Sequence, residues 1–344
     1  MPAVQAAYGP LNTRAHRGSI RGVRMAVDRA TGMFLEQMAA AGGKPLHEST
    51  PEEARALGGM LAALAGPAPK MARVENHAVK VPGGEVPVRV LVPIEPPRGV
   101  IVYYHGGGWV LGTIDEFDTM ARKLAERTSC AIVLVDYRLA PEYRYPVAVD
   151  DSYAALEWVG EHLRDIAGAT NAPLIVAGDS AGGNLAAVMA LRARDRNGPH
   201  LDLQVLIYPV TDADFDRPSY TAPENQLLLT RDAMIWFWDH YLPDAARRTE
   251  PDASPIRATN LAGLPPAVVL TAEHDPLRDE GEAYAARLAE AGVPVSLQRY
   301  AGQMHAFFSL LMLPGSEQGF QQVVKAVRAC IVRQSKAQPA LPSR

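Results

Sequence analysis

The chain has 344 residues, 48% of them hydrophobic and 21% charged, a balance that excludes a wholly disordered chain and a collagen-like one. Its 34 basic and 38 acidic side chains give a net charge of −4, so no excess of positive charge is present to neutralise phosphates, and nucleic acid is not expected as a partner. The two cysteines, Cys130 and Cys330, are too few for a disulfide framework or a four-thiolate zinc site, which indicates a reducing compartment.

The N-terminal segment lacks the features of a leader or a membrane anchor. Arginines recur every few residues before Asp28 and interrupt any apolar core, so this segment is interpreted as the solvated face of a helix. The longest apolar stretches, Leu57–Ala65 and Phe307–Leu313, are far shorter than the roughly 20 residues that cross a bilayer. We therefore expect a soluble, cytoplasmic protein with no membrane contact.

A helix is predicted to begin after Thr50. Thr50 and Glu53 have the spacing of a capping box, and Pro51 suits the first helical position. Gly66 and Pro67 are expected to end this helix. Its apolar face should consist of residues at helical spacing, namely Leu57, Met60, Leu61 and Leu64.

The next segments predict a sheet. Two alternating stretches, Val74–Val81 and Val86–Val92, flank a glycine turn and predict an antiparallel hairpin. Beyond Pro97, short runs rich in Val, Ile and Leu alternate with helical patterns, which indicates parallel strands covered by helices on both faces. The expected strands are Val100–Tyr104, Ala131–Val135, Leu174–Ala177, Leu203–Tyr208, Ala267–Thr271 and Val295–Arg299. The fold class is therefore α/β, with a mostly parallel central sheet and antiparallel N-terminal strands.

One long segment, Thr211–Arg257, interrupts the alternation of strands and helices. It is rich in aromatic residues and prolines and too long for a plain connection, so it is interpreted as an inserted helical lid. The N-terminal helices also lack strand partners and are expected to pack with it. We therefore predict a helical cap made of residues 1–70 and 211–250, a catalytic core made of residues 71–210 and 251–335, and a frayed tail over 336–344.

The motif Gly178-Asp179-Ser180-Ala181-Gly182 lies between a predicted strand and a predicted helix. This placement is typical of a nucleophile elbow, in which a serine sits on a sharp turn. The flanking glycines let neighbouring backbone pass without a clashing Cβ, and the helix directs its positive end at the serine oxygen. An ordinary tight strand–helix turn remains the alternative interpretation of the motif alone.

A second glycine-rich loop, His105–Trp109, follows the strand Val100–Tyr104. Three consecutive glycines indicate amides that must approach a ligand oxygen closely, as in a loop that stabilises an oxyanion. The loop lacks the Gly-Lys-Ser/Thr ending of a phosphate loop, and its spacing does not match a dinucleotide-binding turn. A plain flexible loop remains possible on this motif alone.

A serine nucleophile needs a base and an acid that orients the base. His305 follows the last predicted strand, and Asp275 follows the strand Ala267–Thr271, so both should lie at the carboxyl edge of the sheet with Ser180. Asp279 and Glu280 compete with Asp275 for the acid role, and His274 is a weaker rival of His305. Asp275 also has an alternative structural role in an Asp-Pro turn.

These motifs together resemble the hormone-sensitive-lipase-type esterases, bacterial family IV of the α/β-hydrolase superfamily. The matching segments, all between about Val100 and Phe308, are His105–Trp109, Tyr137–Glu142, Gly178–Gly183, Asp275–Glu280 and Gly302–His305. The resemblance implies an α/β-hydrolase fold, and it implies that the amides of Gly107, Gly108 and Ala181 form the oxyanion hole. One departure is that the family usually has glycine after the histidine, where this chain has Ala306.

The sequence therefore predicts a serine carboxylesterase without metal or cofactor. Ser180 is expected to attack a small ester, His305 to take its proton and Asp275 to orient the imidazole, with an acyl-enzyme intermediate. An amidase or deacetylase with the same triad is the alternative, and a non-catalytic ligand receptor is a remote one.

The size of the substrate is predicted from the aromatic insert. We expect Trp109, Trp236 and Trp238 to bind substrate and to close a pocket suited to short- and medium-chain acyl groups, of about four to eight carbons. If these rings only pack the cap onto the core, the site is instead an open groove. The last strand, if it lies at the sheet edge, makes a homodimer possible.

Overall fold

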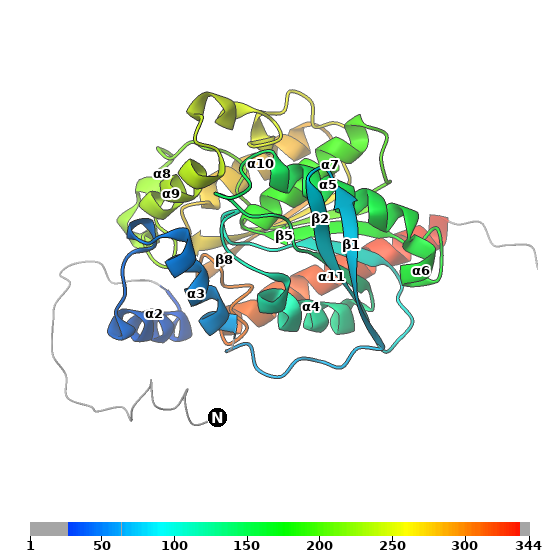
Figure 1. Ribbon diagram of the computed structural model, residues 1–344, viewed down its shortest axis with the longest axis horizontal. Helices are drawn as coiled ribbons and strands as arrows, with labels where there is room; N and C mark the ends of the chain where they lie inside the picture. Colours follow the sequence, from blue (N-terminus) through cyan, green and yellow to red (C-terminus); the bar gives the residue numbers. More distant parts are fainter. Residues whose placement is uncertain (1–26, 63, 338–344) are drawn as a thin grey trace, which may run out of the picture.

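The protein is built on one eight-stranded sheet (Figure 1). The computed structural model describes residues 27–62 and 64–337. In chain order the strands are β1 (Arg73–Val81), β2 (Gly84–Val92), β3 (Val100–Tyr104), β4 (Ala131–Val135), β5 (Leu174–Asp179), β6 (Leu203–Ile207), β7 (Ala267–His274) and β8 (Val295–Met304). Their order across the sheet is β1-β2-β4-β3-β5-β6-β7-β8. The strands β1 and β2 pair antiparallel with each other and β2 pairs antiparallel with β4, whereas all later pairs are parallel.

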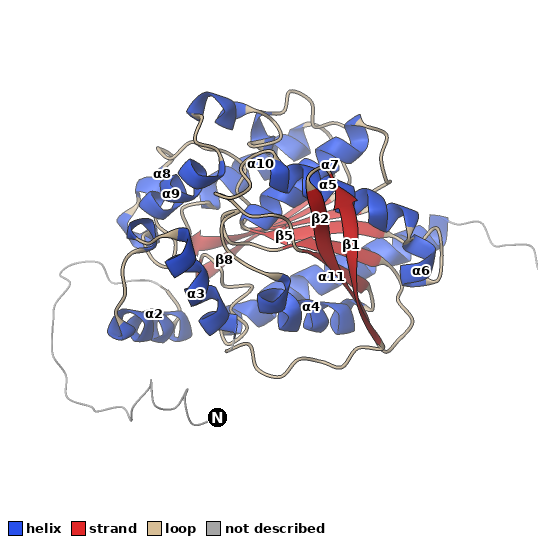
Figure 2. Cartoon of the chain, viewed as in Figure 1, coloured by secondary structure: helices blue, strands red, loops and turns tan. Residues whose placement is uncertain are grey.

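Helices cover both faces of the sheet (Figure 2). One face carries α4 (Ile114–Thr128) and α11 (Pro314–Ala337), and the other carries α5 (Val147–Glu161), α7 (Ala181–Asp195) and α10 (Arg278–Glu290). The remaining helices are α2 (Arg29–Ala41), η1 (Leu46–Glu48), α3 (Pro51–Ala62), α6 (Leu163–Ala167), α8 (Pro218–Thr221), η2 (Pro223–Asn225), α9 (Arg231–Tyr241), η3 (Ala245–Thr249) and η4 (Pro255–Arg257). Of the helices in the described part of the chain, none combines the length and the apolar character needed to cross a membrane.

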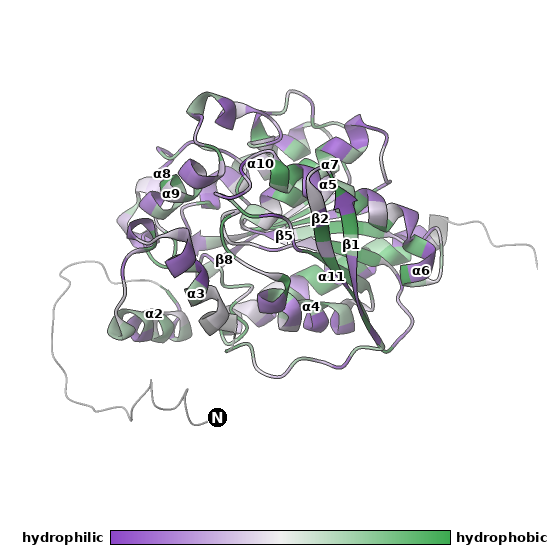
Figure 3. Cartoon of the chain, in the orientation of Figure 1, coloured by the Kyte–Doolittle hydropathy of each residue, from purple (hydrophilic) through white to green (hydrophobic). Residues whose placement is uncertain are grey.

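The continuous apolar runs become strands because both faces of the sheet are buried. In β3, Val100, Val102 and Tyr104 pack into the core on one face, while Ile101 and Tyr103 pack into the core on the other. Figure 3 shows the same pattern, with hydrophobic residues on the central strands and mixed character on the surrounding helices. A strand that is buried on both faces carries apolar side chains on both, so its sequence does not alternate between apolar and polar residues.

The predicted strands are all present, but several extend further than expected. The hairpin of β1 and β2 is confirmed, with Val81 paired to Gly84 across the turn. The strand β8 continues to Met304, five residues beyond the predicted end, and β7 continues to His274. Asp275 therefore follows β7 directly, and His305 follows β8 directly, without the loop that a strand end at Arg299 predicts.

The predictions for the N-terminal helices and for the C-terminal tail have different outcomes. The capping box at α3 is confirmed, because the amide of Glu53 donates to Thr50 Oγ1 at 3.2 Å and the amide of Thr50 donates to Glu53 Oε2 at 3.0 Å. The expected arginine-rich helix face before Asp28 lies outside the described residues, as do the side chains of Leu57, Met60 and Leu61. The helix α11 reaches Ala337, two residues into the tail that was expected over 336–344, and the rest of that tail, 338–344, is also outside the described residues.

The segments that do not belong to the sheet layers lie together beside its carboxyl edge (Figure 1). The helices α2 and α3 come from the N-terminal part, and α8 and α9 come from the insert between β6 and β7. The helix α9 packs against η1, and α2 packs against β8. The insert contains only short helices and loops, because its prolines and buried aromatic rings provide no strand pattern.

Candidate active site

Ser180 lies on the sharp turn between β5 and α7. Its backbone has φ 57° and ψ −120°, a conformation that non-glycine residues rarely adopt. A Cβ on Gly178 would collide with the backbone of Gly182, and a Cβ on Gly182 would collide with the carbonyl of Tyr104. The two glycines are therefore required because neighbouring backbone passes too close for any side chain.

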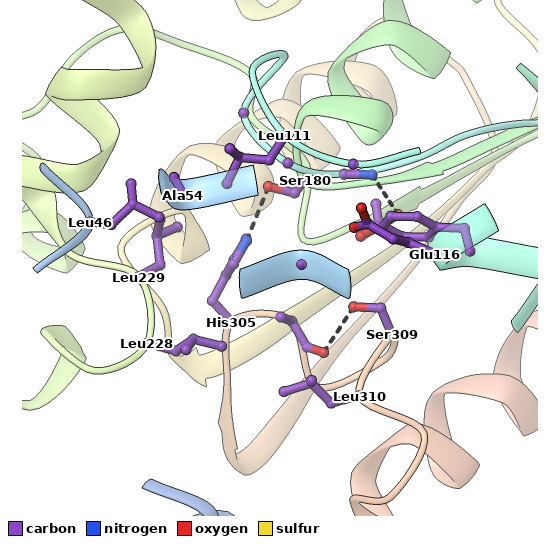
Figure 4. Close-up of a pocket in the computed structure, with 18 of the residues that line it drawn as sticks. Leu46, Ala54, Leu111, Glu116, Ser180, Leu228, Leu229, His305, Ser309 and Leu310 are labelled. Atoms are coloured by element: carbon purple, nitrogen blue, oxygen red, sulfur yellow. Dashed lines mark hydrogen bonds between the residues drawn. The ribbon is translucent and has the colours of Figure 1, made fainter. Parts of the chain in front are cut away.

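Ser180, His305 and Asp275 form a chain of hydrogen bonds, of which Figure 4 shows the bond between Ser180 and His305. Ser180 Oγ lies 3.0 Å from His305 Nε2, and His305 Nδ1 lies 2.8 Å from Asp275 Oδ2. The other carboxylate oxygen of Asp275 accepts the amide of Leu277 at 2.9 Å. Because an ionised carboxylate only accepts, Nδ1 carries the proton in this arrangement and Nε2 presents its lone pair to the serine hydroxyl.

The alternative acids are engaged elsewhere. Asp279 accepts the amide of Ser219 at 2.8 Å, and Glu280 is buried and accepts the amide of Thr211 at 2.8 Å. Burial raises the pKa of Glu280 well above its ordinary value. Both residues thus attach the start of the insert to α10, and the structure places only Asp275 on the imidazole. His274 is the buried last residue of β7 and makes no hydrogen bond to Ser180.

The glycine loop lies directly beside the serine. Gly107 and Gly108 have φ values of 115° and 59°, in the region that favours glycine. Among the described residues, the amides of Gly107, Gly108 and Ala181 donate to no protein acceptor. The two loop amides and the first amide of α7 are therefore available to a ligand oxygen, in line with the role that the resemblance implies.

Asp179 holds this loop in place, a role that the sequence analysis did not assign. Its Oδ1 accepts the amide of Gly106 at 3.0 Å and the hydroxyl of Tyr103 at 2.9 Å. Burial raises the pKa of Asp179 to about 6, and these two donors oppose that rise. The available signal was the acidic residue at the end of an otherwise apolar strand, where an ionisable side chain needs a specific partner.

His105, the first residue of the glycine loop, packs against its neighbours and helps to hold the loop. Its ring stacks on Tyr137 with centroids 4.4 Å apart, and its Nδ1 lies 2.7 Å from the carbonyl of Gly106. The hydroxyl of Tyr137 also donates to the backbone carbonyl of His105 at 2.7 Å. Tyr137 thus supports the glycine loop through its contacts with His105.

A cavity of about 280 Å³ opens onto Ser180 and His305 (Figure 4). Its walls are mainly aliphatic and come from segments far apart in the sequence. The apolar side chains that line it include Met38, Leu46, Ala54, Leu228, Leu229, Met234, Phe237 and Leu310. Such a cavity can hold the apolar part of a small ligand close to the serine.

The prediction that three tryptophans line this pocket is wrong. Trp109 and Trp238 are fully buried and pack on Tyr241, with Trp109 stacked on that ring at 4.2 Å. Trp236 lies against His240 on the other side of α9. Only Phe237 of this aromatic cluster faces the cavity, because consecutive helical residues point about 100° apart.

The described residues contain no group of three or more His, Cys, Asp or Glu side chains arranged to hold a metal ion. Cys130 and Cys330 are both buried. Burial raises the pKa of Cys130 to about 12 and that of Cys330 to about 11, so neither thiol is a nucleophile at neutral pH.

The chain is similar to known esterases along most of its length. The model of the α/β-hydrolase fold family matches residues 101–309. The chain is 42% identical over 266 residues to carboxylesterase NlhH of Mycobacterium tuberculosis, which covers 75% of this chain and 83% of that protein. It is 35% identical over 311 residues to an ethyl acetate hydrolase of Pseudomonas putida, covering 88% of this chain and 98% of that protein. Among solved structures, a hyperthermophilic esterase from the archaeon Pyrobaculum calidifontis matches with a TM-score of 0.82 and 38% identity, over 90% of this chain and 100% of that one.

Proposed function

The chain belongs to the α/β-hydrolase family as a carboxylic ester hydrolase of the hormone-sensitive-lipase type, and from this premise we propose that Ser180, His305 and Asp275 carry out the hydrolysis. The observation that carries this proposal is the continuous chain from Ser180 Oγ through the imidazole to Asp275, with bonds of 3.0 and 2.8 Å, at the wall of an apolar cavity.

The mechanism follows from this geometry. His305 Nε2 accepts the proton as Ser180 Oγ attacks the ester carbonyl, and Asp275 stabilises the resulting imidazolium. The developing oxyanion accepts hydrogen bonds from the amides of Gly107, Gly108 and Ala181, each worth roughly 3 kcal/mol. The imidazolium then protonates the leaving alcohol, which leaves an acyl group on Ser180. Water, deprotonated by the same imidazole, attacks that acyl group and releases the acid.

An active-site-directed probe tests the covalent step. A fluorophosphonate should add one phosphonyl group to the protein, and peptide mapping should place it on Ser180. Ser180→Ala should take up none, whereas Ser309→Ala, which changes another serine of the cavity wall, should still be labelled. Labelling of Ser180→Ala at the parent rate would contradict the assignment of the nucleophile.

We also propose that residues 1–70 and 211–250 act as a cap on a core formed by 71–210 and 251–335. Both cap segments contribute to the cavity wall in the described part of the chain, with Leu46 and Ala54 from the first and Leu229 and Phe237 from the second. The contact between η1 and α9 joins the two segments. Such a cap limits the space above the serine and excludes water from it.

The aliphatic wall of the cavity supports a preference for acyl groups of about four to eight carbons. Each buried CH₂ contributes about 0.8 kcal/mol until the cavity is full, after which further carbons stay in water or overpack the wall. The test is kcat/KM for p-nitrophenyl esters of two to sixteen carbons, each below its micelle concentration. A maximum at twelve carbons or more would indicate an open groove.

A homodimer is proposed on a separate observation. The strand β8 is the last strand of the sheet order, and Leu297 on it is 44% exposed. An open edge of this kind can pair with a second copy of itself. Light scattering should give twice the mass of the chain, and Leu297→Lys should shift it towards the monomer.

A further inference from the structure

The cavity has two ends of different chemistry. In Figure 4 the Ser180–His305 pair lies between them. The leucine end is formed by Leu46, Leu228 and Leu229. The opposite end carries Glu116 and Ser309, and Glu116 brings an ionisable group that the hydrolytic mechanism does not use.

Glu116 lies in the first turn of α4, three residues after the N-cap Thr113. This spacing is that of a capping box, in which the glutamate accepts the amide of the N-cap residue. At α3 that reciprocal bond is made, from the Thr50 amide to Glu53 at 3.0 Å. At α4 the Glu116 amide donates to Thr113 Oγ1 at 3.4 Å, but in the described chain the Glu116 carboxylate accepts only a bond of 3.4 Å from the Thr113 hydroxyl and none from the Thr113 amide. The reciprocal half of the cap is therefore not made, and the Glu116 carboxylate lies at the cavity wall.

The surroundings of this carboxylate are largely apolar. It lies against α3, where a Cβ built on Gly58 would be 2.5 Å from Glu116 Oε2. Its neighbour Phe117 lines the same cavity. Among the described residues no basic side chain lies within 4 Å of it, and burial raises the pKa of Glu116 above its ordinary value. A half-buried carboxylate of this kind gains much by meeting a positive charge.

Building on the proposed ester hydrolysis, we propose that Glu116 is a specificity-determining residue that favours esters carrying a quaternary or primary ammonium group at this end of the cavity. A cation placed there would be attracted by the carboxylate through a medium of low dielectric constant and could also contact the ring of Phe117. A substrate with a carboxylate in the same position would be repelled. The leucine end would take the apolar part of the molecule.

Matched substrate pairs test this assignment. Butyrylcholine and 3,3-dimethylbutyl butyrate differ only by a positively charged nitrogen in place of carbon on the alcohol side. The p-nitrophenyl esters of 4-(trimethylammonio)butanoic acid and 5,5-dimethylhexanoic acid differ in the same way on the acyl side. We would measure kcat/KM for both pairs at low salt and pH 8, well above the ordinary pKa of a glutamate, and express each pair as a ratio of cation to isostere.

Glu116→Gln should lower this ratio about tenfold for the pair whose cation reaches the carboxylate. The matched control is Glu126→Gln, an exposed position on the same helix, which removes the same charge and should leave both ratios unchanged. A carboxylate-bearing ester such as a p-nitrophenyl hemisuccinate should gain in Glu116→Gln relative to a neutral ester.

Two results would overturn the assignment. Unchanged ratios for both pairs in folded Glu116→Gln would leave Glu116 with a purely structural role. An equal fall of the ratio in Glu126→Gln would mean that the overall charge of the protein, rather than the cavity, attracts the cation. Failure of the underlying hydrolytic proposal is distinguished separately, because Ser180→Ala would then still turn over the neutral isosteres.

Discussion

The core side and the cap side of the cavity are held together by different kinds of interaction. The core side, formed by the loop 105–109, Asp179, Ser180 and His305, is fixed by oriented hydrogen bonds between buried polar groups. The cap side, formed by residues 27–62 and 211–250 in the described chain, lines the cavity mainly with aliphatic and aromatic side chains.

This difference separates the tasks of the two sides. Directional bonds fix the position of a reacting atom to within a few tenths of an ångström, which catalysis requires. Apolar contacts are not directional and tolerate changes of side chain as long as the volume is kept. Changes on the core side should therefore lower kcat, and changes on the cap side should mainly alter which substrates bind.

The largest expected effect comes from breaking the hydrogen-bonded chain on the core side. Ser180→Ala and His305→Ala should each remove nearly all ester turnover, because triad members act as a unit. Asp275→Asn should lower kcat on the order of 10⁴-fold, since an amide favours the wrong imidazole tautomer. Steady-state kinetics and a thermal melt for each variant provide the measurement. Near-normal turnover by folded Asp275→Asn would transfer the acid role to another carboxylate.

The second prediction is that Asp179 makes the free energy of unfolding depend on pH. Because its pKa is raised to about 6, the folded protein retains this proton up to about pH 6, whereas the unfolded chain releases it near pH 4. The stability contributed by the protonated form is therefore lost as pH rises from about 4 to about 6, by up to about 3 kcal/mol. Asp179→Asn should remove this loss, so the variant should be more stable than the parent at pH 8.

Activity should change in the opposite direction. An uncharged amide holds the Gly106 amide and the Tyr103 hydroxyl less strongly than a carboxylate does, so kcat should fall by about tenfold in Asp179→Asn. Tyr103→Phe is the companion variant, because losing that donor should raise the pKa of Asp179 further and move the stability change to higher pH. Equal pH dependence of urea unfolding in parent and Asp179→Asn would show that this carboxylate does not carry the effect.

Much of the core side could be predicted from the sequence, because its signals are local. A serine between glycines, placed after an apolar strand and before a helix, is typical of the nucleophile elbow. The topology of a parallel sheet then brings Asp275 and His305 to the same edge as this serine. The cap side could not be predicted in this detail. Which face of α9 is turned to the cavity depends on how the helix packs, so the sequence could not separate Phe237, which faces the cavity, from Trp236 and Trp238, which do not.

Contacts between segments far apart in the chain could not be predicted from the local sequence either. Arg55 on α3 donates to the carbonyl of Val110 at 2.8 Å and makes two bonds of 2.7 Å to Glu142, 87 residues away. In the sequence Arg55 is one of many charged residues on a helix, and its role follows only from the folded arrangement. It adds to the polar contacts that Ser219 and Thr211 make with α10.

Arg55 therefore offers a way to test the separation of tasks. Arg55→Met should raise KM several-fold with a smaller change in kcat, because it loosens α3 without touching the triad. A double-mutant cycle with Glu142→Gln should give a coupling of up to about 1 kcal/mol in unfolding free energy, since the pair is partly exposed.

The same pair has a defined pH dependence. The bonds from Arg55 lower the pKa of Glu142 to about 2, so the coupling is present above the ordinary glutamate pKa and is lost as pH falls from about 4.5 towards 2. Repeating the cycle at pH 7 and pH 3 provides the check. A fall in kcat with unchanged KM in Arg55→Met would mean that the cap side also positions the reacting groups.

The smallest expected effect on stability is that of a substitution at Ala306, which follows His305 in the cavity wall. Ala306 has φ 68°, a left-handed conformation that costs an alanine about 1 kcal/mol and a glycine almost nothing. Glycine in turn loses more backbone entropy on folding, which offsets part of the gain. Ala306→Gly should therefore stabilise the protein by a few tenths of a kcal/mol up to about 1 kcal/mol, with kcat little changed because the hydrogen bonds of His305 remain.

The matched control is Ala291→Gly at the end of α10, where φ is −79° and the same change should destabilise the protein. Urea unfolding of the two variants would show opposite signs. If both destabilise equally, the left-handed backbone at Ala306 is not strained, and the packing of its methyl group against Leu310 matters more than the backbone does.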